Sequence, residues 1–223
     1  MARSFIVRLG AAAASLSLLA AQGAAAYDYP LSDHAVREAY FLGRTTNSEK
    51  LKKFLERYAK QFPVPPKGPH VAEIEFRTPY EQVVLRSWRN SVGYSSQQAQ
   101  KDYAAQPDLV VVRVLIYLTP TYAGFITHPS FGKGQAFERP EDFWQEFQFR
   151  VEQDRVIVPG KIDGRPIYNS GARGPYRVVG ALQGAEVSLE FSARQFTSRA
   201  VHIQVIPPEG RSVEAEFDLA DLK

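Results

Sequence analysis

The stretch Leu109–Leu118, with the sequence LVVVRVLIYL, decides the fold of this chain. Pro107 precedes it, Thr119-Pro120 closes it, and Arg113 is its only charged residue. A run so rich in β-branched residues, bounded by prolines, predicts a strand rather than a helix. Alternate side chains of a strand point to opposite faces, and both faces here are mostly apolar. The stretch therefore predicts a strand in the middle of a sheet. Arg113 is expected either to extend its charged end to solvent or to pair with a carboxylate, and both are favoured over an anion site.

Short strands separated by turn signals are expected in the second half of the chain. Dipeptides typical of turns, such as Asp163-Gly164 and Gln183-Gly184, fall between the apolar alternating runs. Such spacing is typical of an antiparallel sandwich. The expected strands are 144–152, 155–158, 176–182, 187–191, 201–206 and 213–219.

Helices are predicted before the central strand. Ser32 can cap a helix that ends at Gly43, and a second helix is expected from residue 47 or 48 to about Gln61. The sequence Thr78-Pro79-Tyr80-Glu81 matches a capping box and predicts a third helix, although a strand through 83–85 is the alternative. A further short helix is expected within 95–106. Because helices precede the strands instead of alternating with them, a parallel α/β fold is disfavoured.

The predicted fold class is therefore mainly β. It is an antiparallel β-sandwich with an N-terminal helical hairpin and one or two further short helices, and an α+β two-layer fold is the alternative. The dense proline run of 62–69 is interpreted as a linker. The expected organisation is a signal peptide at 1–26, a helical hairpin at 27–61, that linker, and a β-sandwich domain at 70–223.

The first residues have the order typical of a secretory signal peptide. Arg3 and Arg8 are basic, an apolar run rich in alanine and leucine spans 9–21, and Ala24-Ala25-Ala26 supplies the small residues of a cleavage site. The apolar run is shorter than the ~20 residues that span a bilayer. The sequence thus predicts export, cleavage after Ala26, a bacterial periplasmic or secreted location, and no stable membrane insertion of the mature chain.

Charge and cysteine content exclude several classes of function. The formal net charge is +3, and two of these charges come from Arg3 and Arg8. The mature chain is therefore close to neutral, which disfavours nucleic acid as a partner. The chain contains no cysteine, so neither a disulfide nor a thiolate metal site can form.

Motifs for catalysis are missing from the sequence. Neither a G-x-S-x-G elbow nor an H-E-x-x-H motif is present. His34 and Glu38 could offer two metal ligands from one helix face, but without a third ligand they are interpreted as a surface pair. Glu141 and Asp142 are adjacent carboxylates with Glu146 nearby, and Glu141 and Asp142 are interpreted as turn or capping residues. No catalytic residue, metal or other cofactor is therefore predicted.

The long stretch from Thr119 to Trp144 is the candidate binding region. Loops of this length usually serve a function or are disordered, and disordered segments rarely contain so many aromatic residues. One interpretation is that the rings cover the open end of the sandwich. The other is a binding surface of rings and cations, formed by Tyr122, Phe125, His128, Phe131, Lys133, Phe137 and Arg139.

These features together predict an exported, non-catalytic binding or interaction protein of the cell envelope. A glycan, a peptide or an envelope protein is the expected partner. The alternative is an envelope hydrolase that acts on glycans or esters through an Asp/Glu pair brought together only by the fold.

Overall fold

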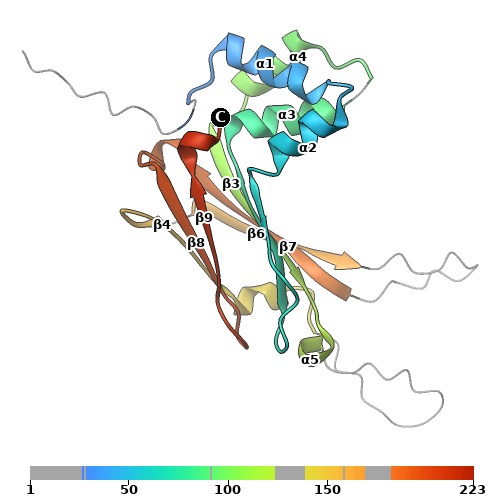
Figure 1. Cartoon of the computed structure of the whole chain (residues 1–223), viewed down its shortest axis with the longest axis vertical. Coiled ribbons are helices and arrows are strands. Elements are labelled where there is room, and N and C mark those ends of the chain that lie inside the picture. Colours follow the sequence, from blue (N-terminus) through green and yellow to red (C-terminus); the bar gives the residue numbers. More distant parts are fainter. Residues whose placement is uncertain (1–26, 28, 91, 124–138, 158, 169–181) are drawn as a thin grey trace, which may run out of the picture.

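Two antiparallel sheets form the body of the molecule (Figure 1). The computed structural model describes residues 27, 29–90, 92–123, 139–157, 159–168 and 182–223. One sheet contains β1 (Ala59–Gln61), β2 (His70–Arg77), β3 (Leu109–Tyr117), β6 (Lys161–Tyr168) and β7 (Leu182–Ser192), in the order β1-β2-β3-β7-β6. The other contains β4 (Gln148–Gln153), β5 (Arg155–Ile157), β8 (Ala200–Ile206) and β9 (Val213–Asp218), in the order β5-β4-β8-β9.

The strand β3 lies at the centre of the first sheet, as its sequence predicts. It pairs with β2 on one side and with β7 on the other, both antiparallel. The side chains of Val110, Val112, Val114 and Ile116 are completely buried, whereas those between them are half-buried. The alternation predicted from the sequence is therefore confirmed, and it defines an inner and an outer face of the sheet.

The two sheets share one apolar core. Apolar side chains from the inner faces of both sheets are buried against one another, and Phe76 and Phe217 lie with ring centroids 5.7 Å apart. Burial of such surface is the main favourable contribution to folding. The mainly β, sandwich-like class with helices is thus confirmed. The core includes Ile74, Phe76, Val187, Leu189, Phe191, Val151, Val201, Ile203, Val205 and Phe217.

Four helices gather at one end of the sandwich (Figure 1). They are α1 (Asp33–Gly43), α2 (Ser48–Leu55), α3 (Pro79–Arg89) and α4 (Ser96–Ala104). Each begins after a polar residue whose side chain accepts a hydrogen bond from a backbone N–H three residues later, which stabilises the first turn. The capping residues are Ser32, Asn47, Thr78 and Ser95.

A second apolar cluster holds these helices together. It contains Leu31, Ala35, Val36, Ala39, Leu51, Tyr80, Val83, Val84 and Ala99. Phe54 of α2 packs against both this cluster and the sandwich core, so the helical layer is continuous with the sheets. Four single turns complete the described elements: α5 (Pro120–Ala123), η1 (Phe143–Glu146), η2 (Ala193–Gln195) and η3 (Leu219–Asp221). Among the described residues, no helix has the length and apolarity needed to cross a membrane.

The helix α2 is shorter than its sequence predicts. It ends at Leu55 instead of continuing to about Gln61, and 59–61 forms the edge strand β1. The cause is Tyr58, whose side chain is buried in the sandwich core instead of extending the helical stripe. The proline-rich residues 62–69 then connect the paired strands β1 and β2. The predicted division into hairpin, linker and sandwich domain stays a prediction.

Two predicted turns are wrong because their glycines serve close packing. Gly164 lies within β6, where a Cβ would approach the Trp144 ring to 2.1 Å. Gly184 lies within β7, where a Cβ would be 2.1 Å from the carbonyl oxygen of Ile116. Glycine in a strand often marks such an approach. Trp144 itself belongs to η1, so β4 begins at Gln148 and not at Trp144 as expected.

The remaining expectations for secondary structure have clear outcomes. The segment after Thr78 is the helix α3, which excludes the alternative of a strand through 83–85. The expected helix within 95–106 is α4. Residue 158 and residues 176–181 of the expected strands lie outside the described residues.

A charged cluster lies on the outer face of the first sheet. The guanidinium of Arg113 donates to Glu75 at 2.6 Å, to Glu73 at 2.5 Å and to Glu186 at 2.9 Å. Arg77 is 2.7 Å from the same oxygen of Glu75. The expected pairing of Arg113 with carboxylates is therefore confirmed. It compensates the cost of placing an arginine within an apolar strand.

The predicted capping box of α3 forms only in part. Thr78 accepts from the backbone N–H of Glu81 at 3.3 Å, but the Glu81 carboxyl is completely buried and has no hydrogen-bond partner among the described residues. Burial disfavours the charged form and raises the pKa of Glu81 well above its usual range, and the charge of Glu75 adds to this effect. Arg77 and Arg113 oppose the shift.

Replacing Glu81 should therefore change how stability depends on pH. As pH rises above the ordinary glutamate pKa of ~4.3, the unfolded chain releases this proton while the folded chain retains it. The contribution to the free energy of unfolding then declines until pH exceeds the raised pKa. We expect Glu81→Gln to be more stable than the original chain by about 1–2 kcal/mol at about pH 8, with a smaller difference at about pH 5.

Urea unfolding at both pH values measures this difference. Glu49→Gln is the control, because that side chain is well exposed on α2. It should preserve the original pH dependence. The same pH dependence in Glu81→Gln and in the original chain would contradict the assignment.

Candidate functional site

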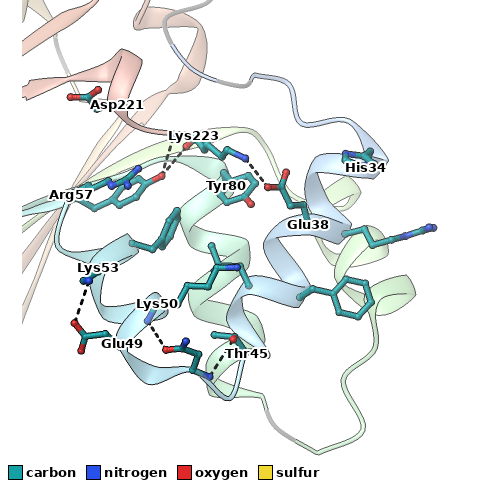
Figure 2. Close-up of a pocket in the computed structure, with 16 residues that line it drawn as sticks. His34, Glu38, Thr45, Glu49, Lys50, Lys53, Arg57, Tyr80, Asp221 and Lys223 are labelled. Atoms are coloured by element: carbon teal, nitrogen blue, oxygen red, sulfur yellow. Dashed lines mark hydrogen bonds and ion pairs between the residues drawn. The ribbon is translucent and has the colours of Figure 1, made fainter.

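A groove lies between α1 and α2 at the helical end of the molecule. It encloses a cavity of about 850 Å³. Tyr80 of α3 contributes to its floor, and the segment with Asp221 and Lys223 lies along one side (Figure 2). The lining is completed by His34, Arg37, Glu38, Phe41, Leu42, Thr45, Asn47, Glu49, Lys50, Lys53, Phe54, Arg57 and Tyr58.

Aromatic side chains provide the apolar part of this groove. Phe54 lies with its ring centroid 4.9 Å from that of Tyr58 and 5.9 Å from that of Tyr80. Phe41 on α1 is different, because 60% of this large apolar residue is exposed. An exposed phenylalanine beside a cavity offers apolar surface to a ligand.

Lys223 is held firmly at the upper edge of the groove in Figure 2. Its backbone N–H donates to the Tyr58 hydroxyl at 3.0 Å, and its main-chain oxygen accepts from the Thr78 hydroxyl. Its Nζ is 2.7 Å from Glu38 Oε1 and 5.4 Å from the centroid of the Tyr80 ring. The hydrogen bond from Lys223 lowers the pKa of Glu38, so this carboxylate stays charged and paired.

Cationic side chains line the α2 side of the groove. Lys50, Lys53 and Arg57 are spaced by three and four residues, and Figure 2 shows them along this side. Lys53 lies 3.8 Å from Glu49, and both side chains are largely exposed, so the pair is weak. The side chains of Lys50 and Arg57 have no hydrogen-bond or ion-pair partner within the described ranges, and neither has Arg37 on α1.

The charged side chains that line the groove are mainly cationic. Its charged groups include five Lys and Arg side chains but only three Asp and Glu side chains. One of those carboxylates, on Glu38, already holds Lys223. In the part of the chain that the structure describes, no group of three or more His, Asp and Glu side chains could hold a metal ion. The arrangement can attract an anion and cover its apolar part.

A second cavity, of about 540 Å³, lies on the other side of α2. It is bounded by Leu51, by Trp88, which is 54% exposed, and by the outer face of the first sheet. Glu75 and Arg113 line this cavity but are paired with each other. Its charges are therefore already compensated within the protein.

Two of the residues predicted to bind a ligand lie in contact with each other. The guanidinium of Arg139 is 4.0 Å from the centroid of the Tyr122 ring, and its Nε donates to the Tyr122 carbonyl at 3.2 Å. The Tyr122 side chain is buried in the sandwich core, and its hydroxyl donates to Glu146 at 3.1 Å. Phe125, His128, Phe131, Lys133 and Phe137 lie outside the described residues. A binding surface on this loop stays a prediction.

The carboxylates near this loop have structural contacts. Glu146 receives the Tyr122 hydroxyl and lies 3.3 Å from Arg139. Glu141 accepts from the hydroxyl of Tyr168, and Asp142 stands at the start of η1. Asp142 makes no capping hydrogen bond through its side chain, and the interpretation of Glu141 and Asp142 as turn or capping residues stays a prediction.

The sequence analysis missed the groove, although two signals for it are present. Phe41 is a large aromatic residue away from the apolar stripe of α1, which places it on the exposed side of that helix. Lys50, Lys53 and Arg57 recur at helical spacing, which places them on one side. By contrast, the pair of Glu38 and Lys223 joins residues 185 positions apart, so no local pattern predicts it.

Comparison with known proteins supplies no family for this chain, because no family model matches it and no curated protein sequence matches it.

Substitutions at the exposed edge of the groove should leave the fold intact. We expect Phe41→Ala and Arg57→Gln each to change the free energy of unfolding by less than about 1 kcal/mol, because both side chains are exposed. Tyr58→Phe should lower it by about 1–2 kcal/mol, since it removes the hydroxyl that pairs with Lys223. Urea unfolding measures all three, and an equal loss in all three would contradict this division.

Proposed function

We propose that this protein is an exported, non-catalytic binding protein of the cell envelope, and that the groove between α1 and α2 is its ligand site. The observation that carries this proposal is the cavity of about 850 Å³ beside the exposed Phe41. Sites for small molecules are typically concave, mostly apolar and ~300–1,000 Å³ in volume. The cations Arg37, Lys50 and Arg57, which have no partner among the described residues, add the polar groups that orient a ligand.

The shape of the groove favours a small molecule over a protein partner. Two helices form its walls, a third contributes to its floor, and the segment with Lys223 lies along one side. Standard protein–protein interfaces bury roughly 800 Å² of each partner, whereas small-molecule sites are concave clefts such as this groove. Glycans and short peptides, the partners expected from the sequence, remain candidates that a binding screen can compare.

The alternative of an envelope hydrolase finds little support among the described residues. Glu75 and Glu81 are neighbouring carboxyl groups with opposed environments, the usual mark of an acid–base pair. However, Glu81 is completely buried, and the Glu75 carboxylate is held by Arg77 and Arg113. Glu75 lines the second cavity but its carboxylate is already paired there, and Glu81 does not line that cavity, so this pair supports a structural role instead.

Export rests on the order of residues in the first part of the chain. Basic residues, a short apolar run and the small residues Ala24-Ala25-Ala26 are typical of a cleaved signal peptide. We expect the protein, expressed in a bacterial host with its own N-terminal segment, to begin at Tyr27. N-terminal sequencing of the purified protein measures this, and a protein that still begins at its first residues would contradict export by this route.

A thermal-shift screen tests the binding function. Oligosaccharides, peptidoglycan fragments, short peptides, nucleotides and small organic acids are compared on the purified protein. A ligand at ~100 times its dissociation constant should stabilise the fold by ~2.7 kcal/mol. We expect a stabilising ligand whose effect is lost in Phe41→Ala/Arg57→Gln but preserved in Phe125→Ala/Phe131→Ala. The reverse pattern would move the site to the predicted loop, and no shift with any compound would contradict the proposal.

A further inference from the structure

We infer that the ligand of this groove is a small amphipathic anion, with a flat apolar body and a carboxylate or phosphate group. This inference rests on the proposed binding function and adds the chemical class of the ligand. It follows from the distribution of charge and apolar surface around the cavity.

The charge of the lining is the first step. Five Lys and Arg side chains face three Asp and Glu side chains, and the two ion pairs within the groove leave Arg37, Lys50 and Arg57 without partners in the described part of the chain. Asp221 is the one Asp or Glu side chain of the lining outside those two pairs. The free charge of the groove is therefore positive, and an anionic ligand compensates it.

The second step of the argument concerns Glu38, whose carboxylate is paired with Lys223. A cationic ligand would need an available carboxylate inside the groove. Glu38 is engaged by Lys223 at 2.7 Å, and its lowered pKa keeps this pair charged. Displacing Lys223 would also disturb a residue whose main chain is hydrogen-bonded to Tyr58 and Thr78. The groove thus disfavours cations while its α2 side attracts anions.

The apolar surface is the third step. Phe41 on α1 is exposed, and Phe54 on α2 is partly buried against Tyr58 and Tyr80. Aromatic faces prefer flat partners in stacked or edge-to-face arrangements. A ligand with a flat apolar body could contact Phe41 while its anionic group meets Lys50 and Arg57. One ligand molecule would then contact both the aromatic and the cationic side chains of the lining.

Two fluorescent probes with nearly the same apolar body test this class. 8-Anilinonaphthalene-1-sulfonate carries an anionic group, and N-phenyl-1-naphthylamine is its neutral counterpart. Both are titrated against the purified full chain, with fluorescence as the readout. We expect the anionic probe to bind about tenfold more tightly than the neutral one, which corresponds to roughly one or two charge-assisted contacts. Added salt should weaken the anionic probe selectively.

Variants assign this difference to particular side chains. Lys50→Gln/Arg57→Gln should reduce binding of the anionic probe about tenfold and leave the neutral probe unchanged. Phe41→Ala should weaken both probes. The matched control is Lys52→Gln/Lys101→Gln, which removes the same charge from exposed positions outside the lining of the groove and should change neither. Cooperative unfolding of every variant excludes probe binding to a loosened fold.

The result separates this inference from the function on which it rests. Equal binding of the two probes, with both weakened by Phe41→Ala, would overturn the anionic class and preserve the groove as a binding site. No binding of either probe, or binding that no groove variant changes, would overturn the groove as the ligand site and the anionic class with it.

Discussion

The arginine at the centre of β3 is the constraint on which the rest of the structure depends. Arg113 lies on the outer face of the first sheet, where a charge without partners would be costly. Two glutamates of β2 and Glu186 of β7 surround it, all within 2.9 Å. These contacts reach across three adjacent strands and are formed in the register in which Arg113 lies opposite Glu75. Side-chain alternation then directs the apolar residues of all three strands to the inner face.

That register also determines where the groove forms. The strand β2 leads through Thr78 directly into α3, so the position of β2 places Tyr80 in the floor of the groove. Thr78 is also the residue that holds the main-chain oxygen of Lys223, and Tyr58 holds its backbone N–H. The position of the first sheet therefore determines where the floor and the upper edge of the groove lie. The helix α2 is connected to it through Phe54, which packs against both apolar clusters.

The features that the sequence predicts correctly are local. The central position of β3 in its sheet and the capping residue Ser32 each follow from a few adjacent residues, and both are confirmed. The wrong predictions concern residues whose conformation depends on a distant partner. Gly184 resembles a turn residue in sequence, but Ile116 of the neighbouring strand requires it. The helix α2 stops early because Tyr58 is buried in the sandwich core, and no periodicity contains that information.

The interior of the groove is buried, whereas its edge is exposed. This difference determines which substitutions could change ligand binding without disturbing the fold. Tyr58 and Tyr80 are buried and belong to the two apolar clusters, so replacing either would disturb the packing of the molecule. Phe41, Lys50 and Arg57 are exposed and are not part of either cluster. Substitutions there change the charge and apolar surface offered to a ligand at little cost in stability. Ligand preference can therefore change at the edge while the sheet preserves the shape of the groove.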